Sequence, residues 1–315
     1  MKLLALRGSV PKDRSPKEIM YDGLTNNDDM WEHLFCALGD ERCEILYWGG
    51  NRIRRYTDKD TVVWVRDLKH YSPDFKPDVV FERGGFDEGR RFSKQYPDAY
   101  RIYYGAGKRC LPRNTNLKYD LVLVDSERQL RKARKHGWNA QLWFKPASPQ
   151  FRYMPEVAKY FDVCYVADGR FPFRAKIKNV DWVYETIPKD LKLLHLGWAG
   201  DRFLPKNITV MRVQRAEMPL YYNKCRVGVI PYTGYDSAPR VIPEMIACGL
   251  PVLVSDEVNT NQGQRIPKEN LWDNIKSILK NYIPVCGSST TIQSAAEQIR
   301  GYINAEKRKD GDCGN

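Results

Sequence analysis

Short apolar runs that end in glycine turns recur along the first half of the chain, with helix-like stretches between them. The runs occupy residues 2–6, 45–48, 78–81 and 101–104, and turns follow them at Gly8, Gly49, Gly84 and Gly105. Apolar strands that alternate with helices are typical of a parallel sheet with helices on both faces. Because ligands bind at the carboxyl ends of such strands, we expect Gly8 and the other turns to border a ligand crevice.

The same alternation begins again after residue 150, so the chain is expected to fold as two domains. Its 315 residues suffice for two cores, and Lys145-Pro146-Ala147-Ser148-Pro149 interrupts the pattern as a linker would. We predict an α/β protein with an N-terminal Rossmann-like domain at residues 1–147 and a second one at residues 148–289. The helix at residues 290–307 is expected to pack back on the first domain, and residues 308–315 are expected to form a disordered tail.

Composition narrows the class of protein and of partner. Hydrophobic residues make up 42% of the chain, which excludes general disorder, and the formal net charge of +12 favours an anionic partner. The eight cysteines have no metal-ligand spacing, so they indicate a reducing compartment and no metal site. The opening apolar run is too short for a signal peptide, and no run approaches the length of a membrane span. We therefore expect a soluble, cytoplasmic protein.

The segment from Val227 to Asp256 contains the most informative motif. A strand ends at Pro231, a turn-rich loop presents Asp236, and a helix is expected to begin near Arg240, because Pro243 is tolerated only in the first turn. Such a helix start leaves free backbone N–H groups, here around residues 238–242, at its positive end, where a phosphate binds well. Glu244 is expected at the same mouth, where its carboxylate can accept hydrogen bonds from sugar hydroxyls.

This segment resembles the retaining GT-B glycosyltransferases of the group 1 family. That family carries an acid, seven residues and a Glu within a pattern that appears here as Asp236 followed by Pro243-Glu244-Met245-Ile246-Ala247-Cys248-Gly249-Leu250-Pro251-Val252. The resemblance implies two Rossmann-like domains facing a central cleft, with Asp236 on the donor sugar, Glu244 on the ribose, and backbone amides between them on the sugar and diphosphate. The chain departs from the family with Asp in place of the usual Glu at 236, and with Pro239, which has no N–H, near the usual glycine.

The resemblance extends over most of the second half of the chain. Gly169-Arg170 matches the family's diphosphate-binding turn, and the following cation is either Arg174 or Lys176, with Arg202 and Lys206 as a competing pair. Gly197 matches the glycine turn beneath the donor, and Val213 to Met218 matches the segment that contacts the nucleobase. The predicted catalytic residues are Asp236, Arg170 and Lys176. The predicted donor-binding residues are Gly8, Arg174, Gly197, Val213, Met218, Ser237, Ala238, Arg240, Val241 and Glu244.

The resemblance implies transfer of a hexose or pentose from a nucleotide-sugar, most simply a UDP-sugar, with retention of configuration and no essential metal. The four histidines are interpreted as structural or exposed residues rather than catalytic bases. The acceptor is predicted from charge: basic residues interleaved with aromatic ones suit a phosphate backbone and stacked bases. These residues are Trp48, Arg52, Arg54, Arg55, Tyr56, Arg66, Lys69, Tyr71, Arg83, Arg90, Arg91, Arg109 and Arg113.

We therefore expect the sugar to be transferred to a hydroxyl on an anionic acceptor, preferably DNA with a modified base, as in the DNA glycosyltransferases of phages. The protein would then act in the host cytoplasm. Two alternatives remain open. One is a glycosyltransferase that acts on a lipid-linked or polysaccharide acceptor at the membrane face. The other is a catalytically inactive GT-B protein that binds nucleic acid. The oligomeric state is left open.

Overall fold

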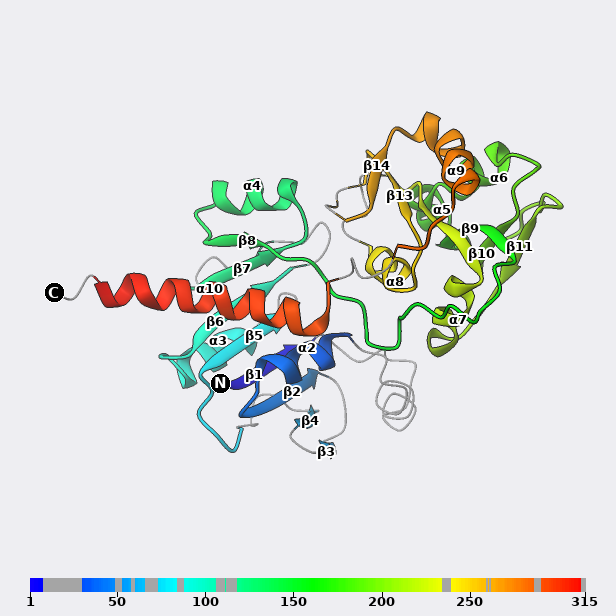
Figure 1. The fold of residues 1–315 in the computed structure, drawn as a ribbon. Helices are drawn as coiled ribbons and strands as arrows, with labels where there is room; N and C mark the ends of the chain where they lie inside the picture. Colours follow the sequence, from blue (N-terminus) through cyan, green and yellow to red (C-terminus); the bar gives the residue numbers. More distant parts are fainter. Residues whose placement is uncertain are drawn as a thin grey trace. The chain divides into compact units, whose positions relative to one another are not determined.

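The chain forms two compact units in a computed structural model (Figure 1). Unit 1 comprises Met1–Phe144 with Thr291–Asn315, and unit 2 comprises Lys145–Thr290. The structure describes residues 1–7, 30–48, 53–57, 60–65, 73–83, 88–105, 111, 118–233, 239–258, 260, 262–285 and 290–312.

Unit 1 is built on an eight-stranded sheet with strand order β3-β4-β2-β1-β5-β6-β7-β8. Every neighbouring pair is parallel except β3 and β4, which are antiparallel. The strands are β1 (Lys2–Arg7), β2 (Arg42–Trp48), β3 (Ile53–Thr57), β4 (Asp60–Val65), β5 (Val79–Arg83), β6 (Tyr100–Tyr104), β7 (Leu121–Val124) and β8 (Ala140–Leu142). The helices are α2 (Met30–Leu38), α3 (Glu88–Gln95), α4 (Glu127–Lys135) and α10 (Ile292–Asp312).

The last helix completes the core of unit 1, although nearly the whole of unit 2 precedes it in the chain. Helix α10 lies beside α2, and it buries Ala295, Ala296, Ile299 and Ile303 in the cluster that holds Trp31. The Trp143 Nε1–H donates to the Ala295 carbonyl at 3.4 Å, which ties the end of the first chain segment to α10. Unit 1 therefore needs both ends of the chain to close its core.

Unit 2 is built on a six-stranded, fully parallel sheet with strand order β11-β10-β9-β12-β13-β14. In order of sequence this is 3-2-1-4-5-6, which places the topological switch point between β9 and β12. The strands are β9 (Phe161–Asp168), β10 (Leu193–Trp198), β11 (Ile208–Met211), β12 (Cys225–Ile230), β13 (Val252–Ser255) and β14 (Gln264–Ile266). The helices are α5 (Pro172–Lys178), α6 (Val180–Thr186), α7 (Met218–Asn223), α8 (Val241–Ala247) and α9 (Leu271–Lys280), with short 3₁₀ turns η3 (Arg215–Glu217) and η4 (Lys268–Asn270).

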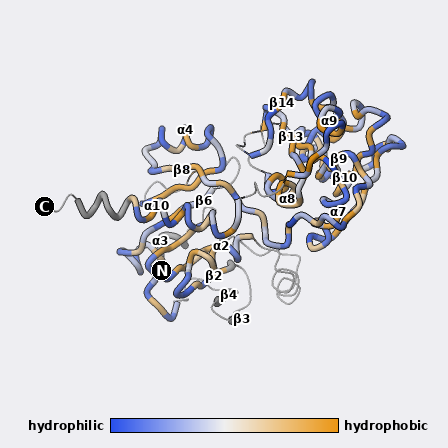
Figure 2. The backbone as a smooth tube through the Cα atoms, viewed as in Figure 1, coloured by the Kyte–Doolittle hydropathy of each residue, from blue (hydrophilic) through white to orange (hydrophobic). Residues whose placement is uncertain are grey.

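Two helices, one from each unit, differ in how far they are buried. Helix α4 is mainly hydrophilic and buries Gln129, Leu130 and Ala133, whereas α8 is mainly hydrophobic and buries Ile242, Pro243, Glu244 and Met245 (Figure 2). The motif helix is therefore part of the core of unit 2, and it cannot move without disturbing the sheet beneath it.

The two Rossmann-like α/β units confirm the predicted fold class. Several elements were not predicted: β3, β14, α3, α5 and α6. The end of the chain also differs, because α10 continues to Asp312 while residues 308–315 were expected to be a tail. The tail was expected because residues 308–315 are polar and contain glycine; Lys and Arg are good helix formers, and α10 continues through this polar composition.

No helix in the described ranges is long and apolar enough to cross a membrane.

Candidate functional site

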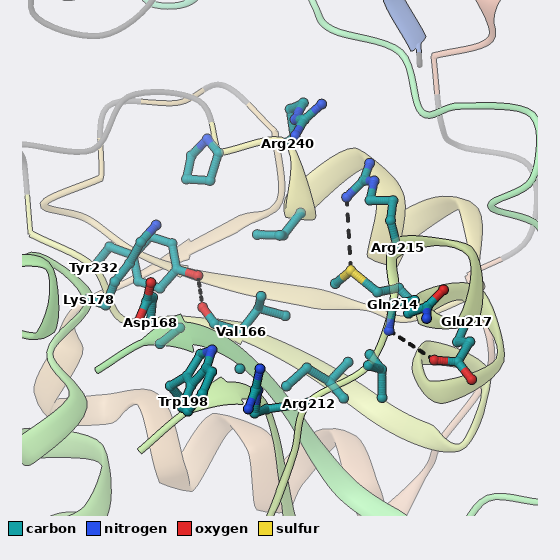
Figure 3. Close-up of a pocket in the computed structure, with 17 residues that line it drawn as sticks. Val166, Asp168, Lys178, Trp198, Arg212, Gln214, Arg215, Glu217, Tyr232 and Arg240 are labelled. Carbon is teal, nitrogen blue, oxygen red and sulfur yellow. Dashed lines mark hydrogen bonds between the residues drawn. The ribbon is translucent and has the colours of Figure 1, made fainter. Parts of the chain in front are cut away.

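A pocket of about 950 Å³ opens at the carboxyl ends of the central strands of unit 2 (Figure 3). Its floor is formed by the ends of β9 and β10, at Val166, Ala167, Asp168, Leu196, Gly197 and Trp198. Its walls are the segment from Arg212 to Met218, Lys178 of α5, Tyr232 after β12, and Pro239 to Val241 at the start of α8. The pocket therefore lies at the switch point between β9 and β12, where open α/β sheets bind their ligands.

Gly197 makes the floor of the pocket possible. It has a φ of +140°, and a Cβ atom on it would lie 1.8 Å from the Ala167 carbonyl oxygen. Gly197 is paired with Ala167 across β10 and β9, so only glycine allows the two strands to remain together at this point. The predicted glycine turn beneath the donor site is thus a position with a specific steric demand.

His195 also stabilises the floor of the pocket through a hydrogen bond to Ala167. Its Nε2–H donates to the Ala167 carbonyl at 3.0 Å, and its Nδ1 accepts from the Tyr184 hydroxyl at 2.5 Å. A carbonyl can only accept, so Nε2 carries a proton in this geometry. Burial lowers the pKa of His195 to about 4, which keeps the ring neutral at physiological pH. His195 is therefore a structural histidine, as the sequence indicated.

Glu244 is buried on α8, and Arg215 holds it. Arg215 Nη1 donates to one carboxylate oxygen at 3.0 Å, and Nη2 contacts the other oxygen. The guanidinium also lies 4.8 Å from the centre of the Phe151 ring, and the Tyr222 hydroxyl lies 3.5 Å from the carboxylate. We refer to this bidentate ion pair as the Arg215–Glu244 fork. Because Arg215 lines the pocket, the fork connects α8 to the wall that contains Val213 and Met218.

The turn that carries Arg215 is fixed by its own capping box. The Gln214 N–H donates to Glu217 Oε2 at 2.9 Å, and the Gln214 side chain in turn accepts from the backbone of Glu217. Both residues line the pocket, so the wall is organised before a ligand binds. Figure 3 shows Gln214, Arg215 and Glu217 along one side of the pocket.

Charge in the pocket is predominantly positive. Four lining residues are cationic, namely Lys178, Arg212, Arg215 and Arg240, whereas two are acidic, Asp168 and Glu217. Arg212 and Arg170 lie over the Trp198 ring, with guanidinium carbons 3.3 and 4.4 Å from its centre. Lys178 Nζ lies 3.6 Å from the centre of the Tyr232 ring. A low-dielectric wall with excess cations favours an anionic ligand such as a diphosphate.

Five of the predicted donor-binding residues line this pocket: Gly197, Val213, Met218, Arg240 and Val241. Glu244 lies behind the wall, in contact with it through Arg215. Gly8, Asp236, Ser237 and Ala238 lie outside the described residues. The expectation of free N–H groups at the start of the helix does not hold at Ile242, whose N–H donates to the Pro239 carbonyl at 3.1 Å. The Pro239 carbonyl accepts from the Ile242 N–H to close a turn, so this N–H is not available to a ligand.

The predicted cations after β9 lie beside the pocket. Arg170 forms an ion pair with Asp168 at 2.8 Å, and Arg174 lies 3.4 Å from the same carboxylate. The hydrogen bond from Arg170 lowers the pKa of Asp168. Lys176 is exposed on α5 and lines neither of the two cavities described in unit 2. Lys178, two residues further along α5, lines the pocket instead.

Sequence reasoning missed Lys178, Trp198, Arg212 and Arg215. Lys178 was missed because helix α5 was not predicted. Without that helix, the side of the chain on which Lys178 lies could not be assigned. Arg215 lies inside the segment expected to meet the nucleobase, but its pairing with Glu244 spans 29 residues and no local pattern reports it. Among the described residues, no three His, Cys, Asp or Glu side chains are grouped so that they could hold a metal ion.

Comparison with known proteins identifies one matching family. Residues 162–280 match the family Glycosyl transferases group 1. No curated protein sequence matches the chain significantly.

Solved structures of similar fold cover almost the whole chain. A sucrose-phosphate synthase from Thermosynechococcus elongatus has a TM-score of 0.59 at 13% identity, covering 99% of this chain and 98% of that one. HepE from Anabaena, in complex with UDP, has a TM-score of 0.57 at 12% identity, with 99% of each chain covered. A glycosyltransferase from Rickettsia africae has a TM-score of 0.59 at 12% identity, with 99% and 97% covered.

The pocket lies within the matched segment, at the switch point of its sheet, and the similar structures extend over both units. The chain thus has the GT-B fold of two Rossmann-like domains, and its second domain matches the group 1 glycosyltransferase family over residues 162–280.

Proposed function

We propose that the protein is a glycosyltransferase that binds a nucleotide-sugar donor in the pocket of unit 2. The observation that carries this proposal is the pocket itself: it lies at the β9–β12 switch point inside the segment that matches the group 1 family, and Glu244 braces its wall. The volume of about 950 Å³ suits a nucleotide-sized ligand. Its cationic excess complements a diphosphate.

The preferred donor in this proposal is a UDP-sugar. HepE, which shares the fold, has been crystallised with UDP and with UDP-glucose. In this chain the segment from Val213 to Met218 would contact the base, and Glu244 would accept hydrogen bonds from the ribose hydroxyls. The Arg215 fork leaves lone pairs on the carboxylate oxygens for this purpose. Asp236 would contact the donor sugar.

Catalysis in this proposal rests on stabilising the leaving diphosphate. Bond cleavage between the sugar and the diphosphate places negative charge on the departing phosphate oxygens. Arg212, Arg240 and Lys178 line the pocket and would stabilise that charge. Arg170 and Lys176, which lie outside the lining, would add to it when the donor is bound. Fixed cations in a pocket with little water stabilise such charge strongly. Transfer with retention is the proposed stereochemistry, and the anomeric configuration of the product, read by NMR, tests it.

A thermal-shift panel tests donor binding. UDP-glucose, UDP-galactose, ADP-glucose and GDP-mannose are added to the whole protein, and the melting temperature is recorded for each. A donor at 100 times its dissociation constant adds about 2.7 kcal/mol of stability, so a clear upward shift is expected for at least one UDP-sugar. Glu244→Gln should abolish that shift, while Glu297→Gln, at an exposed position on α10, should keep it. A panel with no shift for any nucleotide-sugar contradicts the proposal.

The proposed acceptor is a hydroxyl on an anionic molecule, preferably a hydroxymethylated base in DNA. The support is the net charge of +12 and the basic and aromatic residues of the first half of the chain. Of that set, the structure describes only the side chain of Arg83, whose guanidinium carbon lies 4.9 Å from the centre of the Trp31 ring. The base would have to leave the stack to reach the donor.

Transfer of radiolabelled sugar separates the candidate acceptors. Hydroxymethylcytosine DNA should become labelled, unmodified DNA should not, and binding should weaken as salt rises. Label that enters lipid-linked sugars or polysaccharide instead would assign the acceptor to the membrane face. Donor binding without transfer or hydrolysis would indicate a binding protein of this fold.

A further inference from the structure

One helix of unit 1 presents a concentrated positive surface. Helix α4 is nine residues long and contains five cations and a single acid, Glu127. It packs on β7 and on the edge strand β8, and the side chains that it buries are Gln129, Leu130 and Ala133. All five cations are exposed, so the positive charge of this helix is open to a partner.

Four of the five cations lie on one side of the helix, and we refer to them as the basic face: Arg128, Arg131, Lys132 and Lys135. At about 100° per residue, these four positions fall within an arc of about 100° opposite the buried side chains. Neighbours in the arc are three or four positions apart, which places their side chains about 5–6 Å from one another. The fifth cation, Arg134, lies beside the arc and donates to the Ala140 carbonyl at 3.4 Å.

The basic face is not neutralised within the part of the chain that the structure describes. None of its four residues forms an ion pair with a described acid, and Glu127, one turn before Arg131, is not within ion-pair distance of it. Arg128 with Lys132, and Arg131 with Lys135, are pairs of like charge at a four-residue spacing, which destabilises a helix. Because an external anion would remove this repulsion, the basic face is suited to a polyanion.

We propose that the basic face binds the sugar-phosphate backbone of DNA, without regard to base sequence. From Arg128 to Lys135 the helix rises about 10 Å, a length over which one strand of DNA presents about three phosphates. The guanidinium groups of Arg128 and Arg131 can each donate two hydrogen bonds to one phosphate. A regular row of cations thus faces a regular row of anions.

The composition of α4 favours a phosphate backbone over a lipid surface. A helix that attaches to a bilayer buries an apolar face in the head-group region. The apolar residues of α4 are Leu130 and Ala133, and both are buried against the sheet of unit 1. The helix therefore offers a bilayer charge but no apolar side chain to insert.

This inference deepens the proposed transfer of sugar to DNA and rests on that proposal for the role of the bound DNA. Phosphate contacts position a duplex but do not read its bases, so the basic face would hold the acceptor while other residues select the base. DNA binding is measured without donor and without a modified base, so the two proposals can fail separately. A donor-induced thermal shift without DNA binding contradicts this inference alone. DNA binding without any donor-induced shift contradicts the proposed function alone.

Fluorescence anisotropy of a labelled, unmodified duplex tests the proposal with the whole protein. The binding constant is measured at salt concentrations from about 50 to 200 mM, and its logarithm should fall linearly with the logarithm of the salt concentration. The triple variant Arg128→Gln, Arg131→Gln, Lys132→Gln should bind at least about tenfold more weakly, with a slope shallower by about 2.7, because each phosphate contact contributes about 0.9. Gln is as good a helix former as Arg and Lys, so this variant should melt no lower than the unchanged protein.

The matched control removes the same charge from unit 2. Lys189→Gln, Lys192→Gln, Lys280→Gln replaces three exposed lysines and gives the same net charge as the α4 variant. This control should bind the duplex with the affinity and the salt slope of the unchanged protein.

Three results would overturn the proposal. The first is an unchanged protein that does not bind the duplex, or an α4 variant that keeps its affinity and salt slope. The second is equal weakening in the α4 variant and the control, which would show that binding follows net charge alone. The third is an α4 variant that keeps DNA binding but no longer sediments with phosphatidylglycerol vesicles, which would make the basic face a lipid surface.

Discussion

Single residues in unit 2 both stabilise the fold and shape the pocket. Arg215 lines the pocket and neutralises Glu244, and His195 holds the Ala167 carbonyl that forms part of the floor. Both residues lie on or next to the strands and turns that form the pocket, so a change in either alters the shape of the site as well as its charge. Their energetic contributions can be separated because one is an ion pair and the other a neutral hydrogen-bonded ring.

Removal of Arg215 should destabilise the protein and weaken donor binding together. Arg215→Met leaves the buried Glu244 carboxylate without its partner, which costs about 3 kcal/mol of unfolding free energy. The control is Arg226→Met, which removes a more exposed pair with Asp162 and should cost less than about 1 kcal/mol. Urea unfolding and the UDP-sugar thermal shift measure the two effects. Equal loss in both variants would show that burial of the Glu244 pair is unimportant.

The burial of His195 predicts a loss of stability in mild acid. The folded-state pKa of about 4 lies below the ordinary value of 6.5, so below pH 6.5 the unfolded chain binds a proton that the folded protein does not. The free energy of unfolding should therefore fall by about 2 kcal/mol from this group as the pH drops from 7 to 5. His195→Gln should lack this part of the pH dependence. If urea unfolding of both proteins changes in parallel, His195 does not titrate as its environment requires.

At the scale of elements, the pocket depends on how β9 and β10 end. The two strands are paired as far as Trp198 and Asp168, and the crowded position is Gly197 opposite Ala167. Helix α8 closes the opposite side, with Pro243 in its first turn as the sequence predicted. The site is therefore formed by strand ends and a helix start, which are rigid supports for a ligand.

Gly197→Ala should destroy the floor of the pocket. The added methyl group would lie 1.8 Å from the Ala167 carbonyl oxygen, at a φ that alanine avoids, so the loss of stability should exceed about 3 kcal/mol and donor binding should vanish. Gly301→Ala is the matched control. A Cβ at Gly301 meets no heavy atom within 4 Å, and in the interior of α10 the change should stabilise the protein by about 0.5–1 kcal/mol. Melting temperatures that move in the same direction for both variants would contradict this.

At the scale of the whole molecule, the chain builds unit 1 from both of its ends and inserts unit 2 between them. Helix α10 supplies Ile299 to the buried cluster around Trp31, and the Arg300 guanidinium donates to the Ala37 and Leu38 carbonyls at 2.5 and 3.5 Å. The core of unit 2 is made entirely of residues between Ala147 and Leu279. The two units should therefore differ in their response to damage at the end of the chain.

Ile299→Asp should unfold unit 1 and spare unit 2. A carboxylate in that buried cluster is expected to cost more than about 4 kcal/mol. Limited proteolysis followed by mass spectrometry should show rapid cleavage within residues 1–144 and a resistant fragment near 145–290. Glu297→Asp, at an exposed position of the same helix, should be cleaved like the unchanged protein. Simultaneous digestion of both units would show that they fold as one cooperative body.

The amino-acid sequence alone was sufficient for the two Rossmann-like units, and it placed Gly197, Val213, Met218, Arg240 and Val241 at what is one pocket. Strand alternation, glycine turns and the Pro243 position are local patterns, and they report on residues that are close in the chain. The Arg215–Glu244 fork and the place of Lys178 in the pocket lining could not be seen there. Each joins segments that are distant in sequence or depends on which face a helix presents, and these relations exist only once the sheet has brought its strand ends together.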